Sequence, residues 1–455
     1  MMESRLPDTP SPVPSLTERL ESLLRRTIDR RDRECAALHL VDWLGCALAG
    51  RQTATGRVLA GAGLEELGSA GGSTHAAAGL AFALGGLGSI LEMDDVDRQG
   101  LLHPGPVVFS AALAAAGEAS GTAFLDAAVR GYEAMVRLGR AVGPGHYAFF
   151  HHTATCGPLG AAVAAGHVAG LGREALVWAM GNATSATGGL WQCRHEQVMT
   201  KPMHCSEAAR RGVTAALLAQ EGLTGPRFIL EGPQGMFKAM CPGADPDAVL
   251  DGGDAAWMIH DTSFKPWPAC RHAHAAIDAA LAFGGAVAPR DIEAIEIETY
   301  AEAVTFCDRP EPRTENEAKF SLQHSVAVAL VDGPPAMQAF APAALARPEI
   351  AALRLRATVT ASERYSAAYP RHFGCGVTLV SRDGKRHARA VADALGDSEN
   401  PMSREMILAK YRKLADHAGT DAAAAGRLLD AAFDLLDDAP VQRLREALLD
   451  AVQSS

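Results

Sequence analysis

The chain has 455 residues and a formal net charge of −11 at pH 7. One hydrophobic core does not keep growing to this length, so we expect two domains. The acidic balance, without any run of Lys and Arg, excludes the concentrated basic face with which a nucleic-acid-binding protein neutralises phosphates. Hydrophobic residues are 48% of the chain but aromatic residues only 5%. Alanine and glycine therefore supply much of the apolar content, which favours closely packed helices.

The cysteines and the apolar segments indicate where in the cell the protein is expected. The nine cysteines are widely spaced and never form Cys-x-x-Cys, so neither a disulfide framework nor a zinc ribbon is indicated. Residues 1–12 contain no apolar signal core, and we interpret them as a mobile tail. The longest apolar run, residues 76–91, is glycine-rich and shorter than the about 20 residues that cross a bilayer. We therefore expect a cytoplasmic protein with no membrane partner.

Helical patterns dominate both ends of the chain. From about Ser15 to Thr262 apolar residues recur at helical spacing, which predicts many helices. Within this stretch residues 157–171 are mostly small, so we expect a central helix that its neighbours approach closely. Helical spacing returns after Ser403, a plausible N-cap, and Gly419 is a plausible stop.

Between these helical regions the pattern changes to that of strands. Apolar and polar residues alternate over 295–299 and over 353–359, which predicts two half-buried strands. The dipeptide at 383–384 is Asp-Gly and separates the segments 377–381 and 387–391, so we expect a hairpin there. The predicted fold is mainly α with an α+β second domain.

The domain boundaries follow from this change of pattern. A helical domain is predicted from residues 1–262 and 399–455, and an α+β domain from residues 263–398. The helical segment at the end of the chain would then return to pack on the first domain.

An acidic segment precedes a histidine in a turn. Glu92, Asp94, Asp95 and Asp97 lie shortly before His103 in the sequence Leu-Leu-His-Pro-Gly. These carboxylates could bind a metal, orient the imidazole as a general base, or form a solvated acidic loop. Neither His-x-His nor His-Glu-x-x-His occurs nearby, so we predict no metal site. The other two interpretations stay open.

A pair of histidines comes directly before the small-residue helix. His151 and His152 are followed by Thr153 and Thr155. An imidazole near a helix N-terminus is well placed beside an anionic ligand, because the free amides there favour negative charge. The alternative is a helix cap by one of the threonines, with both histidines facing solvent.

Two lysines each precede a proline, at Lys201 and Lys265. Proline restricts the preceding residue to extended conformations, and a lysine fixed in this way suits the anchoring of a carboxylate. A single Lys-Pro pair is usually part of a surface loop. Lys265, however, lies at the predicted domain boundary, where ligand pockets tend to form.

A basic cluster follows Lys265 directly. Arg271, His272 and His274 are close in sequence, and we expect the next helix to bring them to the same region as the lysine. Arginine can clamp a carboxylate with two parallel hydrogen bonds, so Arg271 is a candidate substrate ligand.

Taken in order, these motifs resemble the MmgE/PrpD family, whose known members include 2-methylcitrate dehydratase, cis-aconitate decarboxylase and iminodisuccinate epimerase. The matching stretches are residues 91–95, 101–105, 151–157, 201–212, 264–271 and 318–323. The resemblance implies a helical domain built from both chain ends, an inserted α+β domain, a homodimer, and an active site between the domains that needs no cofactor.

The resemblance also implies roles for individual residues. The active-site positions it marks are His103, His151, Lys201 and Lys265. The residues it marks as substrate-binding or supporting are Glu92, Asp94, Asp95, Thr153, His204, Arg271 and His324.

This chain also departs from the family pattern. Many relatives have Asp-Phe-Asp-Asp-Thr where it has Glu92-Met-Asp-Asp-Val96, so a hydroxyl is lost and the first carboxylate is one methylene longer. Relatives often carry tyrosine at the position of His324. Substrate identity is the property that these differences affect.

The expected function is that of a lyase acting on a di- or tricarboxylate, with dehydration of a 2-methylcitrate-like hydroxy acid as the leading hypothesis. Lys201 and Lys265 would stabilise the negative charge that forms when a proton leaves the carbon next to a carboxylate. His103 or His151 would take that proton and the other would donate one, in an order left open. Epimerisation or decarboxylation of a related polycarboxylate would use the same groups. A non-catalytic helical binding protein, in which the basic motifs are incidental, is the alternative from another class.

Overall fold

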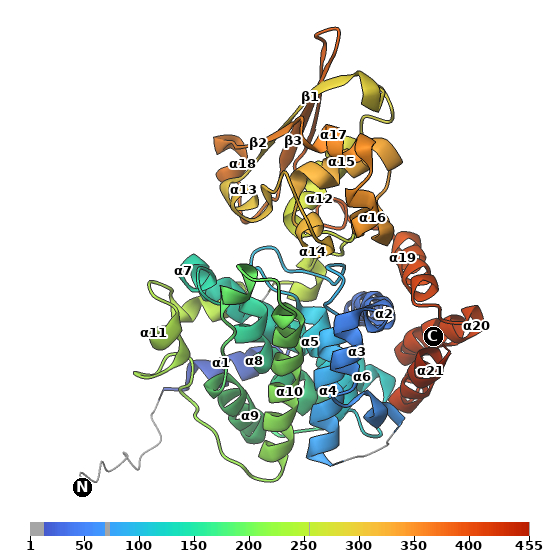
Figure 1. The fold of residues 1–455 in the computed structure, drawn as a ribbon. Helices are drawn as coiled ribbons and strands as arrows, with labels where there is room; N and C mark the ends of the chain where they lie inside the picture. The colour runs from blue at the N-terminus through green and yellow to red at the C-terminus, as the bar shows by residue number, and fades with distance from the viewer. Residues whose placement is uncertain (1–12, 69–72, 254, 455) are drawn as a thin grey trace.

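The computed structural model describes residues 13–68, 73–253 and 255–454, so the predicted tail at residues 1–12 lies outside the described residues. The two largest hydrophobic cores are separate. The first combines buried residues from Leu16 to Ile259 with others from Tyr411 to Ala451, and the second runs from Ala269 to Ala394. Figure 1 shows the corresponding helical and α+β parts stacked on one another. The predicted fold class, mainly α with a smaller α+β part, is confirmed.

The first stretch of the chain is helical, as its spacing predicts. Its helices are α1 (Leu16–Leu24), α2 (Arg30–Arg51), α3 (Ala54–Ala60), α4 (Thr74–Leu87), α5 (Pro104–Ala115), α6 (Gly121–Ala141), α7 (Gly143–Tyr147), α8 (His152–Val168), α9 (Arg173–Ser185), α10 (Thr200–Gln220) and α11 (Met236–Met240). Throughout the described ranges, no helix combines the length and the apolar character needed to cross a membrane.

Helix α8 is the predicted central helix of small residues. It packs against α6 on one side and α10 on another, and glycines lie at both contacts. A Cβ added to Gly160 of α8 would lie 2.5 Å from the Cβ of Met135 in α6, and one added to Gly212 of α10 would lie 2.2 Å from the Cβ of Ala161. Side chains are excluded at these contacts because the backbones approach too closely. The N-terminus of α8, with its two histidines, is therefore held firmly between neighbouring helices.

The α+β part contains a four-stranded sheet in the order β2-β1-β3-β4. Its strands are β1 (Ile292–Thr299), β2 (Ala357–Ala361), β3 (Cys375–Ser381) and β4 (Arg386–Val391). Its helices are α12 (Arg271–Leu281), α13 (Ala301–Cys307), α14 (Glu315–Lys319), α15 (Leu322–Asp332), α16 (Pro342–Leu345), α17 (Pro348–Arg354) and α18 (Glu363–Ser366). Strand β1 pairs in parallel with β2 and antiparallel with β3. Helix α14 lies at the edge of this part that faces the helical part (Figure 1).

Two of the strand predictions are confirmed and one is half wrong. The segment 295–299 lies in β1, and the hairpin joins β3 to β4 with Gly384 at φ 81°. The predicted strand at 353–359 begins only at Ala357, because residues up to Arg354 form α17. Pro348 occupies the first turn of that helix, where its fixed φ and missing N–H are tolerated. Leu355, which the alternation placed in a half-buried strand, is 65% exposed.

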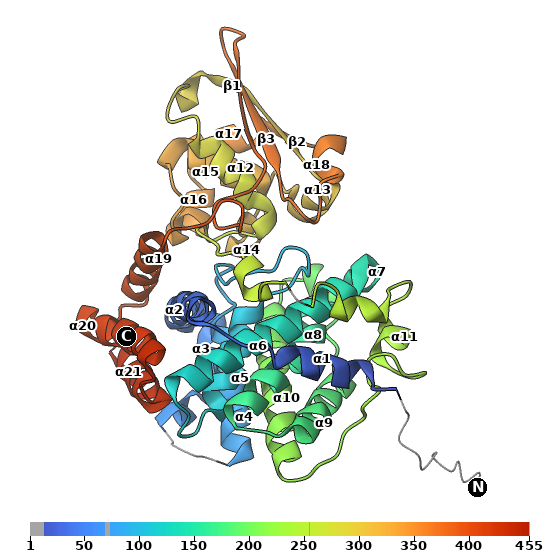
Figure 2. The ribbon, with the colours of Figure 1, turned by 180° about the vertical axis from the view of Figure 1, so that it is seen from behind.

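The chain returns to the helical part through α19 (Arg404–His417), α20 (Ala422–Asp434) and α21 (Val441–Gln453). The side chain of Ser403 accepts a hydrogen bond from the Met406 amide, which confirms the predicted cap, and Gly419 follows the helix at φ 75°. Figures 1 and 2 both show α19 beside α2. The separate cores support domain boundaries near residues 262 and 398, which stay a prediction.

Candidate active site

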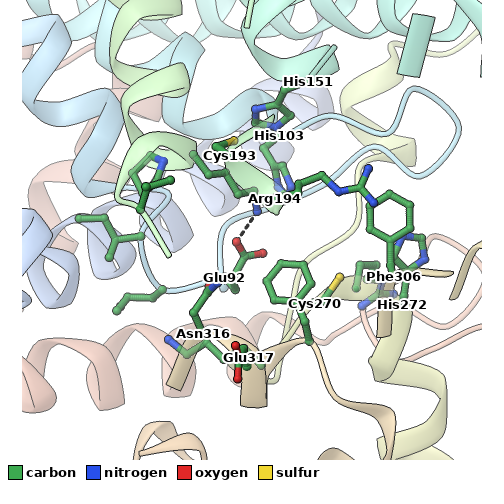
Figure 3. Close-up of a pocket in the computed structure, with 18 of the residues that line it drawn as sticks. Glu92, His103, His151, Cys193, Arg194, Cys270, His272, Phe306, Asn316 and Glu317 are labelled. Atoms are coloured by element: carbon green, nitrogen blue, oxygen red, sulfur yellow. Dashed lines mark hydrogen bonds and ion pairs between the residues drawn. The ribbon is translucent and has the colours of Figure 1, made fainter. Parts of the chain in front are cut away.

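A cavity of about 650 Å³ lies where the helical and α+β parts meet. Figure 3 shows side chains from both parts around it. The predicted active-site residues that line it are His103, His151, Lys201 and Lys265, together with Glu92 and Arg271. Cys270, His272 and Phe306 of the α+β part also line it. All four positions marked as the active site therefore reach one cavity from distant parts of the sequence.

The acidic segment belongs to a loop, residues 88–103, that joins α4 to α5. Two of its non-glycine residues have left-handed backbone conformations, Glu92 at φ 59° and Leu101 at φ 53°. Such a conformation costs of the order of 1–3 kcal/mol and persists only where the surroundings enforce it. The loop thus has one strained residue near each end, and its surroundings must hold it in place.

Contacts from three directions hold this loop. From α19, Lys410 donates to the backbone oxygen of Met93 at 2.6 Å, and the same ammonium lies 2.6 Å from Asp42 Oδ1. Val96 exchanges two backbone hydrogen bonds with Ser263, just before Lys265. The loop is therefore tied to the returning helix and to the segment that enters the α+β part.

The exit from the α+β part contacts the same loop. Arg98 Nη2 lies 2.6 Å from Glu399, and its Nε lies 3.2 Å from Asp397. The segment that enters the α+β part and the segment that leaves it therefore both contact residues 88–103. These contacts fix the loop relative to the two parts that form the cavity.

His103 is oriented by the acidic segment. Its Nδ1 lies 2.8 Å from the backbone oxygen of Asp95 and 3.1 Å from Asp94 Oδ2. Because a carbonyl oxygen only accepts, Nδ1 carries the proton, and in the neutral imidazole Nε2 keeps a free lone pair. This Nε2 makes no hydrogen bond within the described chain. Of the interpretations left open, orientation of a general base fits this geometry.

The solvated-loop interpretation is wrong, because Glu92, Asp94 and Asp95 are all buried. Asp95 does not line the cavity and instead supports the loop, since it accepts hydrogen bonds from Tyr132 Oη at 2.6 Å and from the Gly105 amide at 2.9 Å. Burial alone would raise the pKa of Asp94, but His103 and then Lys265 lower it below its usual range. Asp94 is therefore an ionised partner for the imidazole.

Lys201 lies in the first turn of α10 and not in the extended conformation that the following proline predicts. The first turn tolerates proline because its N–H groups have no partner within the helix. Lys201 forms an ion pair with Glu92. Burial would raise the pKa of Glu92, but Lys201 and Lys265 together lower it to about 2.

Lys265 is the most deeply buried cation of the cavity wall. Its side chain is 0% exposed, and Nζ lies 3.6 Å from Glu92 Oε2 and 3.7 Å from Asp94 Oδ1. Both distances are too long for good hydrogen bonds, and Nζ has no hydrogen-bond partner within the described residues. A buried donor of this kind is costly unless a ligand satisfies it.

His151 occupies the N-cap position of α8 and is buried, as is His152. Its Nδ1 lies 3.1 Å from Nδ1 of His204, which itself does not line the cavity. Burial, followed by the charge of Lys201, lowers the pKa of His151 well below its usual value, so its imidazole is neutral near pH 7. The ring centroids of His151 and His103 are 6.5 Å apart.

The alternative of a threonine cap with solvent-facing histidines is wrong. Thr153 Oγ1 accepts a hydrogen bond from the His103 amide at 3.1 Å, and Thr155 Oγ1 donates to the Gly188 oxygen at 2.9 Å. Thr153 thus connects α8 to the start of α5 and supports His103.

Two residues marked as substrate-binding or supporting have hydrogen-bond partners within the protein. Arg271 lines the cavity, but its terminal nitrogens bind Asp397 and the backbone oxygen of Leu395. His324 does not line it, because α15 turns this imidazole into the α+β part, where Nε2 bonds the Ala339 oxygen at 2.8 Å. His274 is likewise buried away from the cavity. The sequence spacing of these residues did not reveal which face of α12 or α15 each side chain occupies.

Several residues of the cavity wall escaped sequence reasoning. Arg194, Trp191, Tyr147 and Phe306 lie on short segments without a motif, and only the structure brings them together. His272 was expected in a basic cluster. Burial, and next the charge of Arg194, lower its pKa to about 3, so it is neutral.

A possible metal-ligand group lies elsewhere. In the described part of the chain only His372, Asp393 and Glu399 form such a group, outside the cavity lining. Arg98 already contacts both carboxylates, at 3.3 and 2.6 Å.

The arrangement combines an imidazole with a free lone pair, a carboxylate that can stabilise its protonated form, and two ammonium groups. It can remove a proton from a carbon and stabilise the negative charge that results.

Comparison with known proteins agrees with the motifs. The MmgE/PrpD N-terminal domain matches residues 16–249 and the MmgE/PrpD C-terminal domain matches residues 267–435. The chain is 28% identical to cis-aconitate decarboxylase of Mus musculus over 277 residues and to that of Homo sapiens over 276 residues. Each of these matches covers 58% of this chain but only 55% of the relative. A cis-aconitate decarboxylase-like protein, oryM, of Aspergillus oryzae is 27% identical over 356 residues, 71% of this chain and 73% of its own. The two domain matches cover most of the sequence in the family's order, and the chain belongs to the MmgE/PrpD family.

Proposed function

We propose that this protein is a lyase of di- or tricarboxylates that needs no cofactor and acts by moving a proton at the carbon next to a carboxylate. One observation carries the proposal. Lys265, a fully buried ammonium without a hydrogen-bond partner in the described chain, lines the same cavity as the oriented imidazole of His103. An anionic substrate group would satisfy the ammonium and bring its neighbouring carbon to the base.

His103 is the proposed base. Its Nε2 lone pair takes the proton from carbon, and Asp94, 3.1 Å from Nδ1, stabilises the imidazolium that forms. Lys201 and Lys265 bind the carboxylate that gains negative charge in this step, and Glu92 lies beside both ammonium groups. Preorganised charges of this kind act without reorganising at the moment of reaction.

The first candidate reaction is dehydration of a 2-methylcitrate-like hydroxy acid. The C–H bond breaks as His103 takes the proton, the C=C bond forms, and the C–O bond breaks. The leaving hydroxyl takes its proton from the imidazolium of His103 and departs as water. Burial keeps His151 neutral, so His151 is a poor acid. Because His103 then serves both proton transfers from one side of the substrate, we predict a syn elimination.

The second candidate is decarboxylation, favoured by the names of the relatives in mouse, human and Aspergillus oryzae. Here a C–C bond breaks, CO2 leaves, and the imidazolium of His103 donates the proton that the carbon gains. Asp94 supports this reaction as well, since it stabilises the protonated imidazole with which the cycle starts. We further propose a homodimer, on the strength of the family resemblance, and a cytoplasmic location, as expected from the sequence.

Proton NMR of the full chain in deuterated water tests this function, with 2-methylcitrate, citrate, cis-aconitate and iminodisuccinate in parallel. A new alkene signal from 2-methylcitrate or citrate indicates dehydration, a product with one carboxylate fewer indicates decarboxylation, and deuterium at the α-carbon with no other change indicates epimerisation. We expect turnover of at least one acid. Silence across the panel, from protein with an intact melting transition, would contradict the proposed function.

A further inference from the structure

Arg194 is a cationic side chain of the cavity wall that the proposed chemistry does not use. It ends the short helical turn η2 (Trp191–Arg194) of the helical part. Its guanidinium carbon lies 3.9 Å from the ring centroid of Phe306 in α13 and 5.3 Å from that of Trp191. Figure 3 shows Arg194 and Phe306 together at one side of the cavity, next to His272. The guanidinium thus comes from one part of the molecule and rests on a ring of the other.

The charge of Arg194 is uncompensated. The remaining buried or half-buried cations of the wall contact carboxylates: Lys201 and Lys265 lie beside Glu92, Lys319 lies 2.9 Å from Glu315, and Arg271 contacts Asp397. Arg194 forms no ion pair with any residue that the structure describes. An aromatic ring orients a guanidinium but does not neutralise it, so its donors are available to an anion.

The field of this charge reaches the cavity interior. After burial, Arg194 is the largest cause that lowers the pKa of His272, and it opposes the rise that burial produces in the pKa of Tyr147. Both residues line the cavity. Arg309 also lines it without an ion pair, but its side chain is exposed and it contacts no ring face.

We infer that Arg194 binds a second carboxylate of the substrate, remote from the reacting carbon, and so selects for acids with two or more separated carboxylates. This inference rests on the proposed function, because it assigns the reacting carboxylate to Lys201 and Lys265. A guanidinium offers a planar fork that matches a carboxylate with two parallel hydrogen bonds. The guanidinium lies over the ring of Phe306, which holds it at the cavity wall.

Binding of tricarballylate, a saturated tricarboxylate with neither a hydroxyl to lose nor a double bond, tests the inference without turnover. Isothermal titration calorimetry of the full chain would compare wild type with Arg194→Gln, Arg194→Lys and Arg364→Gln. Arg364 is the matched control, because it lies 5.4 Å from the Tyr365 ring but is exposed and outside the cavity lining. We expect Arg194→Gln to weaken Kd by about tenfold to hundredfold, Arg194→Lys to recover part of the loss, and Arg364→Gln to bind within about twofold of wild type.

A Kd for Arg194→Gln within twofold of wild type would overturn the inference, as would failure of the wild type to bind tricarballylate. If Arg194→Gln proves unstable, the Kd of Arg194→Lys for tricarballylate is the test, because lysine keeps the positive charge but lacks the planar guanidinium. A Kd equal to that of wild type then overturns the inference.

Kinetics with any acid that is turned over separates the inference from the proposed function. We expect Arg194→Gln to raise KM for that acid by tenfold or more with a smaller change in kcat. Turnover with an unchanged KM would sink the inference and leave the lyase intact. Arg194-dependent binding of tricarballylate without turnover of any acid would leave the inference standing and sink the proposed function.

Discussion

Replacement of Lys410 by methionine tests how strongly the returning helix supports the active-site loop. The Lys410 side chain is 4% exposed, and its ammonium lies 2.6 Å from Asp42 Oδ1 and 2.6 Å from the Met93 oxygen. Removing one partner of a buried pair leaves the other charge uncompensated, which costs about 3–5 kcal/mol. We therefore expect Lys410→Met to lower the free energy of unfolding by about that amount. Turnover should fall as well, because Met93 connects Glu92 to Asp94.

Urea denaturation followed by circular dichroism near pH 7 measures this effect. The matched control is Lys413→Met on the same helix, an exposed lysine whose loss should change stability by less than about 0.5 kcal/mol. The double variant Asp42→Asn/Lys410→Met should recover much of the loss, because no buried carboxylate is then left unpaired. A Lys410→Met variant within 1 kcal/mol of Lys413→Met would refute the reasoning.

Three further results are expected. Burial lowers the pKa values of His152 and His324 to about 4 each, whereas the unfolded chain binds these protons near pH 6.5. The unfolded state therefore binds more protons between pH 6.5 and 4, and the free energy of unfolding should fall with falling pH by about 1.4 kcal/mol per unit for each histidine; constant stability in urea titrations at pH 7 and 5 would contradict this. Glu92→Gln removes the carboxylate that neutralises Lys201 and Lys265, so calorimetry should show tricarballylate bound about fivefold more tightly, roughly 1 kcal/mol, and weaker binding would count against the assigned charges. Exhaustive chelation should leave turnover unchanged, whereas activity that is lost and then restored by a divalent metal would disprove a cofactor-independent reaction.

The motifs of the sequence predicted the positions that reach the cavity, because histidine and lysine are rarely placed in apolar surroundings without a function. His103 and Lys265 are distant in sequence, yet both line one cavity. The alternation at 295–299 and the Asp-Gly turn predicted strands correctly, since both signals are local.

The remaining features depend on tertiary contacts that no local pattern encodes. Lys201 is helical because the proline that follows it lies in the first turn of α10, where proline is tolerated. The general preference of residues before proline for extended conformations does not predict this. His324 points into the α+β part because of how α15 packs. Arg194 and Lys410 have no motif around them, and their importance comes from partners in other parts of the chain.

The most direct test of the account compares turnover by His103→Asn with turnover by His417→Asn, in chelator-treated protein and with the acid that wild type converts. His417 is an exposed histidine at the end of α19 and serves as the control. Asparagine keeps a donor near the position of Nδ1 but has no basic nitrogen, so we predict a loss in kcat of about 10²- to 10⁴-fold with an unchanged melting transition. Turnover by His103→Asn within threefold of the control would contradict the assignment of His103 as the group that carries the proton.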